Sequence, residues 1–268
     1  MSAAGNRGAL VRWQVLRRVR QPLSTLAGPS LFPLLSLGVV SLAFGAVVRP
    51  YLDGMSYTAY LVPLALINVV LFGGIAEGAD AWREADTAIV SRLATFDVGR
   101  EAVVASRAVA YGAAAAIQVA ALVVVLGVAT GLALTVPGVV ATVLLMAAFA
   151  VGIGAFAAGL GSRVRAADNV PGLFHALFLP LTFLSTGYVP LSLFPGGAQW
   201  LVRLNPISWL SEVSRGLLDG TRVRPGELLG ALGAAIGLFI LGLFLVHRAE
   251  RSRDRLRGTG TAAVRFEA

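Results

Sequence analysis

The chain has 268 residues, of which 57% are hydrophobic and only 13% are charged. Soluble domains carry about 25% charged residues, so this composition excludes an ordinary soluble domain and indicates an integral membrane protein. All 22 basic residues are Arg, which leaves a net charge of +8. Because they cluster beside long apolar runs, they indicate membrane flanks on anionic lipid, and no nucleic-acid partner is expected. The lack of Cys excludes disulfides and Cys-based metal or redox sites.

Six apolar stretches are long enough to cross a bilayer, which takes roughly 20 helical residues. They are predicted at residues 26–48, 57–76, 108–132, 139–160, 170–189 and 228–246. The first could be a cleaved signal peptide, but it exceeds the apolar core of roughly 7–15 residues typical of such signals. We expect an all-α integral membrane fold that forms a single domain over 1–268. Its parts are an interfacial segment (1–25), a six-span bundle (26–247) and a basic tail (248–268).

The distribution of Arg predicts the orientation of these spans. With a cytoplasmic N-terminus, the segments inside hold 17 Arg and those outside hold five. Because basic residues concentrate on the cytoplasmic side of membrane proteins, both termini are expected in the cytoplasm. An even number of spans agrees with this orientation.

Two cytoplasmic segments are predicted to form surface helices. Placed on a helix, Trp82, Ile89, Leu93 and Phe96 share an arc of about 60°, opposite a polar side. This amphipathic helix either rests on membrane lipid or docks into a groove of a soluble partner. The stretch 8–20 alternates apolar residues with Arg and predicts an N-terminal helix in the membrane surface.

The segment 190–225 is too apolar for a free loop and too rich in Pro and Gly for one spanning helix. Two short helices that re-enter the outer leaflet fit this pattern, with Trp200 and Trp209 at the interface.

Motifs for catalysis and metal binding are missing. A Walker A loop needs a Lys, and the chain has none, so it is not expected to bind ATP through that motif. His175 and His247 belong to different spans and do not form a zinc motif. Ser185 and His175 are ten residues apart on one predicted helix, about 15 Å, too far for a catalytic dyad. We expect no cofactor or metal on this chain, and no catalytic residue.

A few polar side chains lie within the predicted spans. They are Asn68, Gln118, His175, Thr182 and Thr186, with Tyr111 near the start of the third span. His175, Thr182 and Thr186 share a face about 40° wide and should point into the bundle. They either form hydrogen bonds between helices or line a weakly polar path for an apolar cargo.

Three stretches carry a specific combination of motifs. In chain order they are Tyr60, Leu61, Val62, Pro63; Arg92, Leu93, Thr95, Arg100, Arg107; and Phe183, Leu184, Ser185, Thr186, Gly187, Val189, Pro190, Leu191, Leu204, Asn205, Pro206, Ile207, Arg215, Gly216, Leu217, Leu218, Asp219, Gly220. The combination resembles the permease subunits of type 2 ABC exporters, particularly the daunorubicin-resistance-like branch from bacteria. Phe96 replaces a Pro of that branch, and Ser106 stands where Gly is common.

The resemblance implies a permease in the bacterial inner membrane that pairs with a second permease and two ABC ATP-binding subunits, which bind ATP and Mg. It implies export of a hydrophobic or amphipathic compound such as a drug, natural product or lipid. The residues implied in coupling to the ATPase are Trp82, Ile89, Arg92, Leu93, Phe96 and Arg100, and those of the outer re-entrant motif are Asn205, Pro206, Arg215, Gly216 and Gly220. The alternatives are a lipid-modifying enzyme using His175 or Glu77, and a nonenzymatic membrane assembly factor.

Overall fold

The computed structural model describes residues 28–52, 54–86, 100–163 and 169–263, and the side chains of 28–52, 54–83, 101–163 and 169–249. Within these ranges the chain is helical and has no strand, which confirms the all-α membrane fold. The α-helices are α2 (Gly28–Val48), α3 (Tyr57–Asp86), α5 (Arg100–Thr130), α6 (Val136–Gly161), α7 (Asn169–Phe183), α8 (Gln199–Leu204), α9 (Pro206–Leu218) and α10 (Pro225–Ala263), and the 3-10 helices are η2 (Arg49–Tyr51) and η3 (Leu191–Leu193).

Five of these helices are long and apolar enough to cross a membrane. The five segments are Gly28–Tyr51, Tyr57–Arg83, Glu101–Thr130, Val136–Gly161 and Pro225–Ala249. The predicted fifth span at 170–189 corresponds to α7, which has 15 residues and ends at Phe183. At 1.5 Å per residue, α7 is about 22 Å long, shorter than a hydrocarbon core of about 30 Å. A sixth spanning helix is therefore not confirmed.

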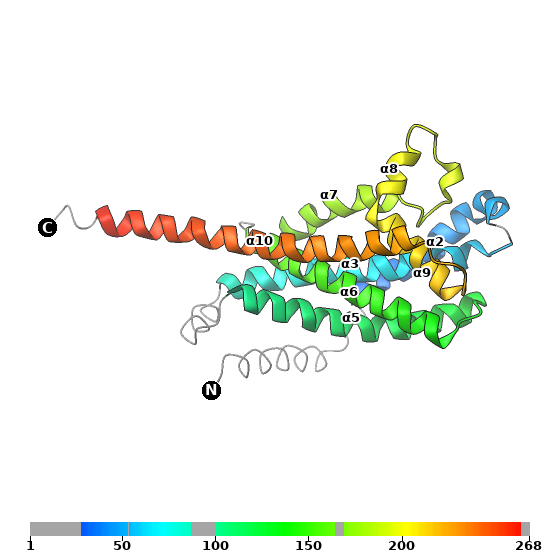
Figure 1. Cartoon of the computed structure of the whole chain (residues 1–268), viewed down its shortest axis with the longest axis horizontal. Coiled ribbons are helices and arrows are strands. Elements are labelled where there is room, and N and C mark those ends of the chain that lie inside the picture. Colours follow the sequence, from blue (N-terminus) through cyan, green and yellow to red (C-terminus); the bar gives the residue numbers. More distant parts are fainter. Residues whose placement is uncertain (1–27, 53, 87–99, 164–168, 264–268) are drawn as a thin grey trace.

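The chain alternates between two ends of the bundle (Figure 1). One end holds the α2–α3 and α5–α6 turns and the start of α10, and we call it the Gly131 end. The opposite end, where α3 and α6 finish and beyond which α10 projects, is the Gly161 end. Since α7 starts at the Gly161 end and α10 at the Gly131 end, the segment from α7 to α9 carries the chain across the bundle without one long helix.

Local sequence explains the turn between α5 and α6. Gly131 has a positive φ of 72°, which Gly adopts without strain, and it ends α5. Thr135 is the N-cap of α6, and its hydroxyl accepts a hydrogen bond from the amide of Gly138 at 3.2 Å. Pro137 fits in the first helical turn because its missing N–H would have no partner there.

Small residues bring the inner helices close together. A Cβ on Gly161 would lie 2.2 Å from the carbonyl oxygen of Gly78, so α6 and α3 touch backbone to backbone at the Gly161 end. Gly152 packs against the carbonyl of Ala235, so α6 and α10 approach equally closely. Such contacts are the usual way to join helices in lipid, where no hydrophobic effect drives association.

Helix α3 lies at the centre and α2 at the periphery. The most apolar window of α3 is 83% buried, whereas that of α2 is 11% buried. Large apolar side chains of α2 such as Leu42 and Val39 point outward. In a membrane protein this outer surface meets lipid or another subunit.

Candidate functional site

A pocket lies between α2, α3 and α7 and encloses about 60 Å³. Three of the five predicted path residues, Asn68, His175 and Thr182, line it. Asn68 comes from α3 and the other two from α7, so helices distant in sequence bring them together. Ser36 and Tyr188 add two further hydroxyl groups to the lining.

The remaining walls of the pocket are apolar and largely aromatic. The ring of Phe72 lies 5.0 Å from that of Phe32 and meets His175 edge-on at 5.7 Å. Phe174 and Phe178 stack at 4.6 Å between ring centroids. No carboxylate is among the described residues that line the pocket. The lining of the pocket is therefore mostly apolar and aromatic, with a few hydrogen-bonding groups.

A smaller hollow extends the pocket toward the Gly131 end. Ser36, Asn68 and Tyr188 line both spaces, and Leu61 and Leu64 lie in the walls of the second. Leu64 also lies close to Gly187, in the turn that follows α7. The two hollows thus lead from the middle of α3 to that turn.

The other two predicted path residues do not line this pocket. The amide of Gln118 on α5 donates a hydrogen bond of 2.6 Å to the hydroxyl of Ser30 on α2, and both side chains are buried. This contact joins two helices, the alternative role considered for polar residues in the spans. Thr186 lies in the turn after α7, where its backbone rather than its hydroxyl is held.

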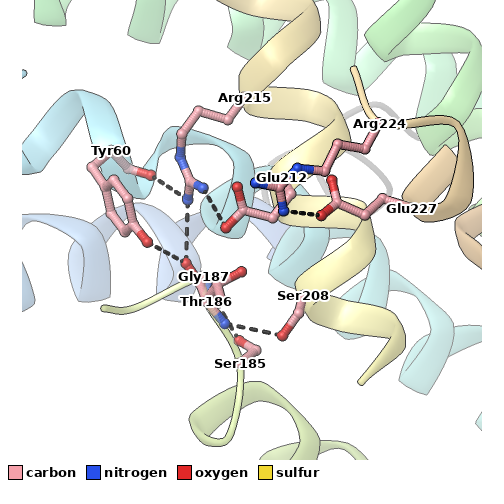
Figure 2. A network of polar contacts seen from close by, with 9 residues as sticks. All are labelled: Tyr60, Ser185, Thr186, Gly187, Ser208, Glu212, Arg215, Arg224 and Glu227. Carbon is pink, nitrogen blue, oxygen red and sulfur yellow. Dashed lines mark hydrogen bonds and ion pairs between the residues drawn. The ribbon is translucent and has the colours of Figure 1, made fainter. Parts of the chain in front are cut away.

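Figure 2 shows how that turn is fixed. The carbonyl of Thr186 accepts hydrogen bonds from the hydroxyl of Tyr60 at 2.6 Å and from Nη2 of Arg215 at 3.2 Å. Its amide donates to the hydroxyl of Ser208 at 3.1 Å. Arg215 also lies 3.8 Å above the ring of Tyr60 and pairs with Glu212 at 3.0 Å. Helices α3 and α9 therefore hold the turn from both sides.

The predicted outer motif forms the joint between α7, α8 and α9. The side-chain amide of Asn205 donates to the carbonyls of Leu181 and Leu184, and its oxygen accepts from the amide of Ile207. Asn205 thus caps α9 and holds the end of α7 at once. Pro206 occupies the first turn of α9. Past the end of α9, Gly220 has a φ of 66°.

Gly216 completes this motif on α9, and a Cβ there would meet Val223 at 3.2 Å. The structure brings two of the three motif stretches together. Tyr60 from the first meets Thr186 and Arg215 from the third in one network. Most of the second stretch lies outside the described residues.

A protein-family model, the ABC-2 type transporter, matches residues 7–218 of the chain. This chain belongs to the ABC-2 type transporter family. It is accordingly the permease subunit of an ABC transporter and a multi-pass membrane protein. No curated protein is significantly similar to it in sequence.

The predicted coupling residues of this permease are described only in part. Trp82 continues the spanning helix α3, which runs ten residues beyond the predicted span, and it is half-buried there. Arg83 beside it pairs with Asp80 at the surface, at 2.9 Å. Arg100 is the first residue of α5. Ile89, Arg92, Leu93, Phe96 and the N-terminal interfacial segment lie outside the described residues.

Sequence reasoning did not anticipate a buried ion pair in the permease. Arg107 on α5 and Glu77 on α3 approach to 3.6 Å, and Nη2 of Arg107 also donates to the carbonyl of Glu77. Two opposite charges at similar depths of neighbouring spans were the available signal. The pair engages Glu77, one of the two residues that the alternative of a lipid-modifying enzyme would use. No group of three His, Asp or Glu side chains that could hold a metal occurs among the described residues.

Proposed function

We propose that this ABC-2 permease exports a hydrophobic or amphipathic compound across a bacterial cytoplasmic membrane, driven by ATP hydrolysed on separate subunits. The observation that carries the proposal is the pocket between α2, α3 and α7. It gathers Asn68, His175 and Thr182 from two helices in a bundle whose spans are predominantly apolar. Aromatic walls with hydrogen-bonding groups and no lining carboxylate favour a neutral aromatic amphiphile, such as a drug or natural product.

The topology supports an arrangement with six crossings. We assign the Gly131 end to the outside, because the positive-inside rule places the Arg-rich segments at the Gly161 end. The segment from α7 to α9 then serves as the fifth crossing, with α8 and α9 as re-entrant elements of the outer leaflet. Both termini would lie in the cytoplasm. Irregular backbone is tolerated at such depth where it is buried in protein, as the turn at Thr186 is.

The complete exporter needs partners. A second permease copy or paralogue would cover the outward face of α2, which is the least buried helix of the bundle. Two ATP-binding subunits, each with ATP and Mg, would dock at residues 82–100. Membership of the daunorubicin-resistance-like branch is consistent with the motifs around Asn205 and Arg215.

Transport by the reconstituted complex tests the pocket. His175→Ala should lower ATP-dependent export of an aromatic amphiphile about tenfold, because a polar wall and the contact with Phe72 are lost. Leu177→Ala is the matched control, since Leu177 lies on the same helix, is exposed and does not line the pocket. Equal export by the two variants would refute the pocket as the path.

Docking of the ATPase is tested by binding. Ile89→Asp and Leu93→Asp should abolish co-purification of the ATP-binding subunit, because a charge would enter an apolar contact. Ser91→Asp, on the polar side of the predicted helix, is the control. Permease purified alone should hydrolyse no ATP. Undiminished binding of the ATP-binding subunit by both aspartate variants would refute the docking site.

A further inference from the structure

Helix α9 has a polar side that is buried. Ser208, Ser211, Glu212, Ser214 and Arg215 cover an arc of about 160° on the helix, and we call them the polar face of α9. The three Ser are 3%, 0% and 0% exposed and the side chain of Arg215 is 12% exposed, whereas that of Glu212 is partly exposed at 36%. An amphipathic helix normally turns its polar side to water. The burial of this face therefore needs an explanation.

Three residues of the polar face, Ser208, Ser211 and Arg215, lie against the turn that follows α7. Ser208 accepts a hydrogen bond from the amide of Thr186, and the hydroxyl of Ser211 lies 3.1 Å from where a Cβ on Gly187 would stand. Arg215 reaches the carbonyls of Thr186 and Tyr60. The two hollows described above end beside this turn, at Leu64. The polar face is thus the next surface on a route from the pocket to the Gly131 end.

Several buried polar atoms on or beside the polar face have no hydrogen-bond partner among the described residues. The hydroxyls of Ser211, Ser214 and Thr186 and Nε of Arg215 make no hydrogen bond within the described part of the chain. Native proteins leave few buried polar groups unpaired, since each costs free energy. Such groups gather where a protein binds water or the polar part of a ligand.

The contact that covers the polar face can be broken. Arg215 holds the carbonyls of Thr186 and Tyr60 through Nη2 alone, at 3.2 and 3.4 Å, near the upper limit for a hydrogen bond. Glu212 on α9 moves with Arg215, so the guanidinium keeps its counter-ion if the helix rotates. Gly220, with positive φ, lies two residues past the end of α9.

We propose that the polar face of α9 is a wall of the exit path in an open state of the permease, and that Arg215 latches it shut in the state described above. The proposal rests on the proposed export function. In the open state the hydroxyls of Ser211 and Ser214 meet water and the hydroxyl or carbonyl groups of the cargo. In the closed state Tyr60 and Arg215 keep the turn at Thr186 against Ser208 and Ser211.

Cysteine accessibility tests this directly, because the chain contains no native Cys. Ser211→Cys and Ser214→Cys change one atom each and create a single thiol on the permease. The full complex with its ATPase is placed in liposomes, outer face outward, and treated with a charged, membrane-impermeant maleimide. Both thiols should react at least ten times faster during ATP turnover than without nucleotide.

Two control positions calibrate the labelling. Ala150→Cys, on the fully buried side of α6, should stay unreactive in both conditions. Arg222→Cys, in the exposed turn after α9, should react at one rate throughout. Adding Arg215→Met to Ser211→Cys should raise labelling about tenfold without ATP, because the latch is removed. If Ala150→Cys becomes reactive in the Arg215→Met background, the bundle itself has opened and the latch is refuted.

The outcomes separate this inference from the proposed function. Active export with Ser211→Cys and Ser214→Cys equally slow in both conditions would overturn the exit wall and leave the exporter intact. A complex that neither hydrolyses ATP nor transports would defeat the proposed function. The Arg215→Met comparison needs no ATP, and unchanged labelling there would overturn the latch on its own.

Discussion

The ion pair between Glu77 and Arg107 joins the two helices that flank residues 87–99. The side chains are 5% and 4% exposed, and N and O lie 3.6 Å apart. Arg107→Leu leaves the carboxylate of Glu77 buried without the guanidinium, and removing one partner of a buried pair destabilises by ~3–5 kcal/mol. At about 2–4 °C per kcal/mol for a chain of this size, the Tm should fall by about 6–20 °C.

The charge itself is tested by a second variant. Glu77→Gln combined with Arg107→Leu removes both charges and should recover most of the lost Tm, because neutral side chains often replace a buried ion pair without loss. Thermal unfolding of the purified protein in detergent, followed by Trp fluorescence at one scan rate, measures both. Arg83→Leu is the control, since its pair with Asp80 is exposed and contributes less than about 1 kcal/mol.

Two results would refute this reasoning. If Arg107→Leu lowers the Tm no more than Arg83→Leu does, the pair does not hold α3 to α5. If the double variant is as unstable as Arg107→Leu alone, the hydrogen bond from Arg107 to the carbonyl of Glu77 and the packing of its stem account for the loss.

Three further outcomes are expected. Gly161→Ala should abolish the peak of folded permease in size-exclusion chromatography, because the new Cβ would overlap the backbone of Gly78. Gly172→Ala is the control and should be tolerated, since the space around Gly172 is open. Asn205→Ala should lower the Tm by at least about 4 °C, because a cap worth ~1 kcal/mol and two bonds to α7 are lost. Burial raises the pKa of the Asp219 carboxyl above its usual 3.8. The folded state therefore binds the proton more tightly than the unfolded state, and the free energy of unfolding falls as the pH rises past about 4. Asp219→Asn should remove that fall, which a series of Tm measurements at different pH values would show.

Hydropathy located the long helices but misjudged where two of them end. The predicted second span stopped at 76 because acidic and basic residues follow, yet α3 continues to Asp86. Glu77 fits there since Arg107 neutralises it, a contact 30 residues away in sequence. The apolar run at 170–189 continues past Phe183, but the helix stops there, and Asn205 binds the carbonyls of Leu181 and Leu184 at this end. Both errors come from long-range contacts that a window of local sequence cannot contain.

The candidate site was predictable where one helix supplies it. His175 and Thr182 are seven residues apart, and helical periodicity alone places them on one face. Asn68 lines the pocket, whereas Gln118 bonds to Ser30 instead. This difference depends on how α3 and α5 pack, which one sequence does not reveal. The burial of the polar face of α9 was likewise hidden, since its pattern resembles that of a helix on a membrane surface.

Helix α3 links the three polar sites of the permease. Near the Gly161 end it is tied to α5 through Glu77, in the middle it offers Asn68 to the pocket, and near the Gly131 end Tyr60 holds the turn at Thr186. Most of α3 is buried among the other helices. Because packed protein interiors resist compression, a displacement of one end of α3 is transmitted to its other end. A push on the segment after Asp86 that shifts α3 would therefore strain the bonds of Tyr60 at the other end. Since the turn at Thr186 covers the polar face of α9, those bonds are where movement of α3 would open the exit.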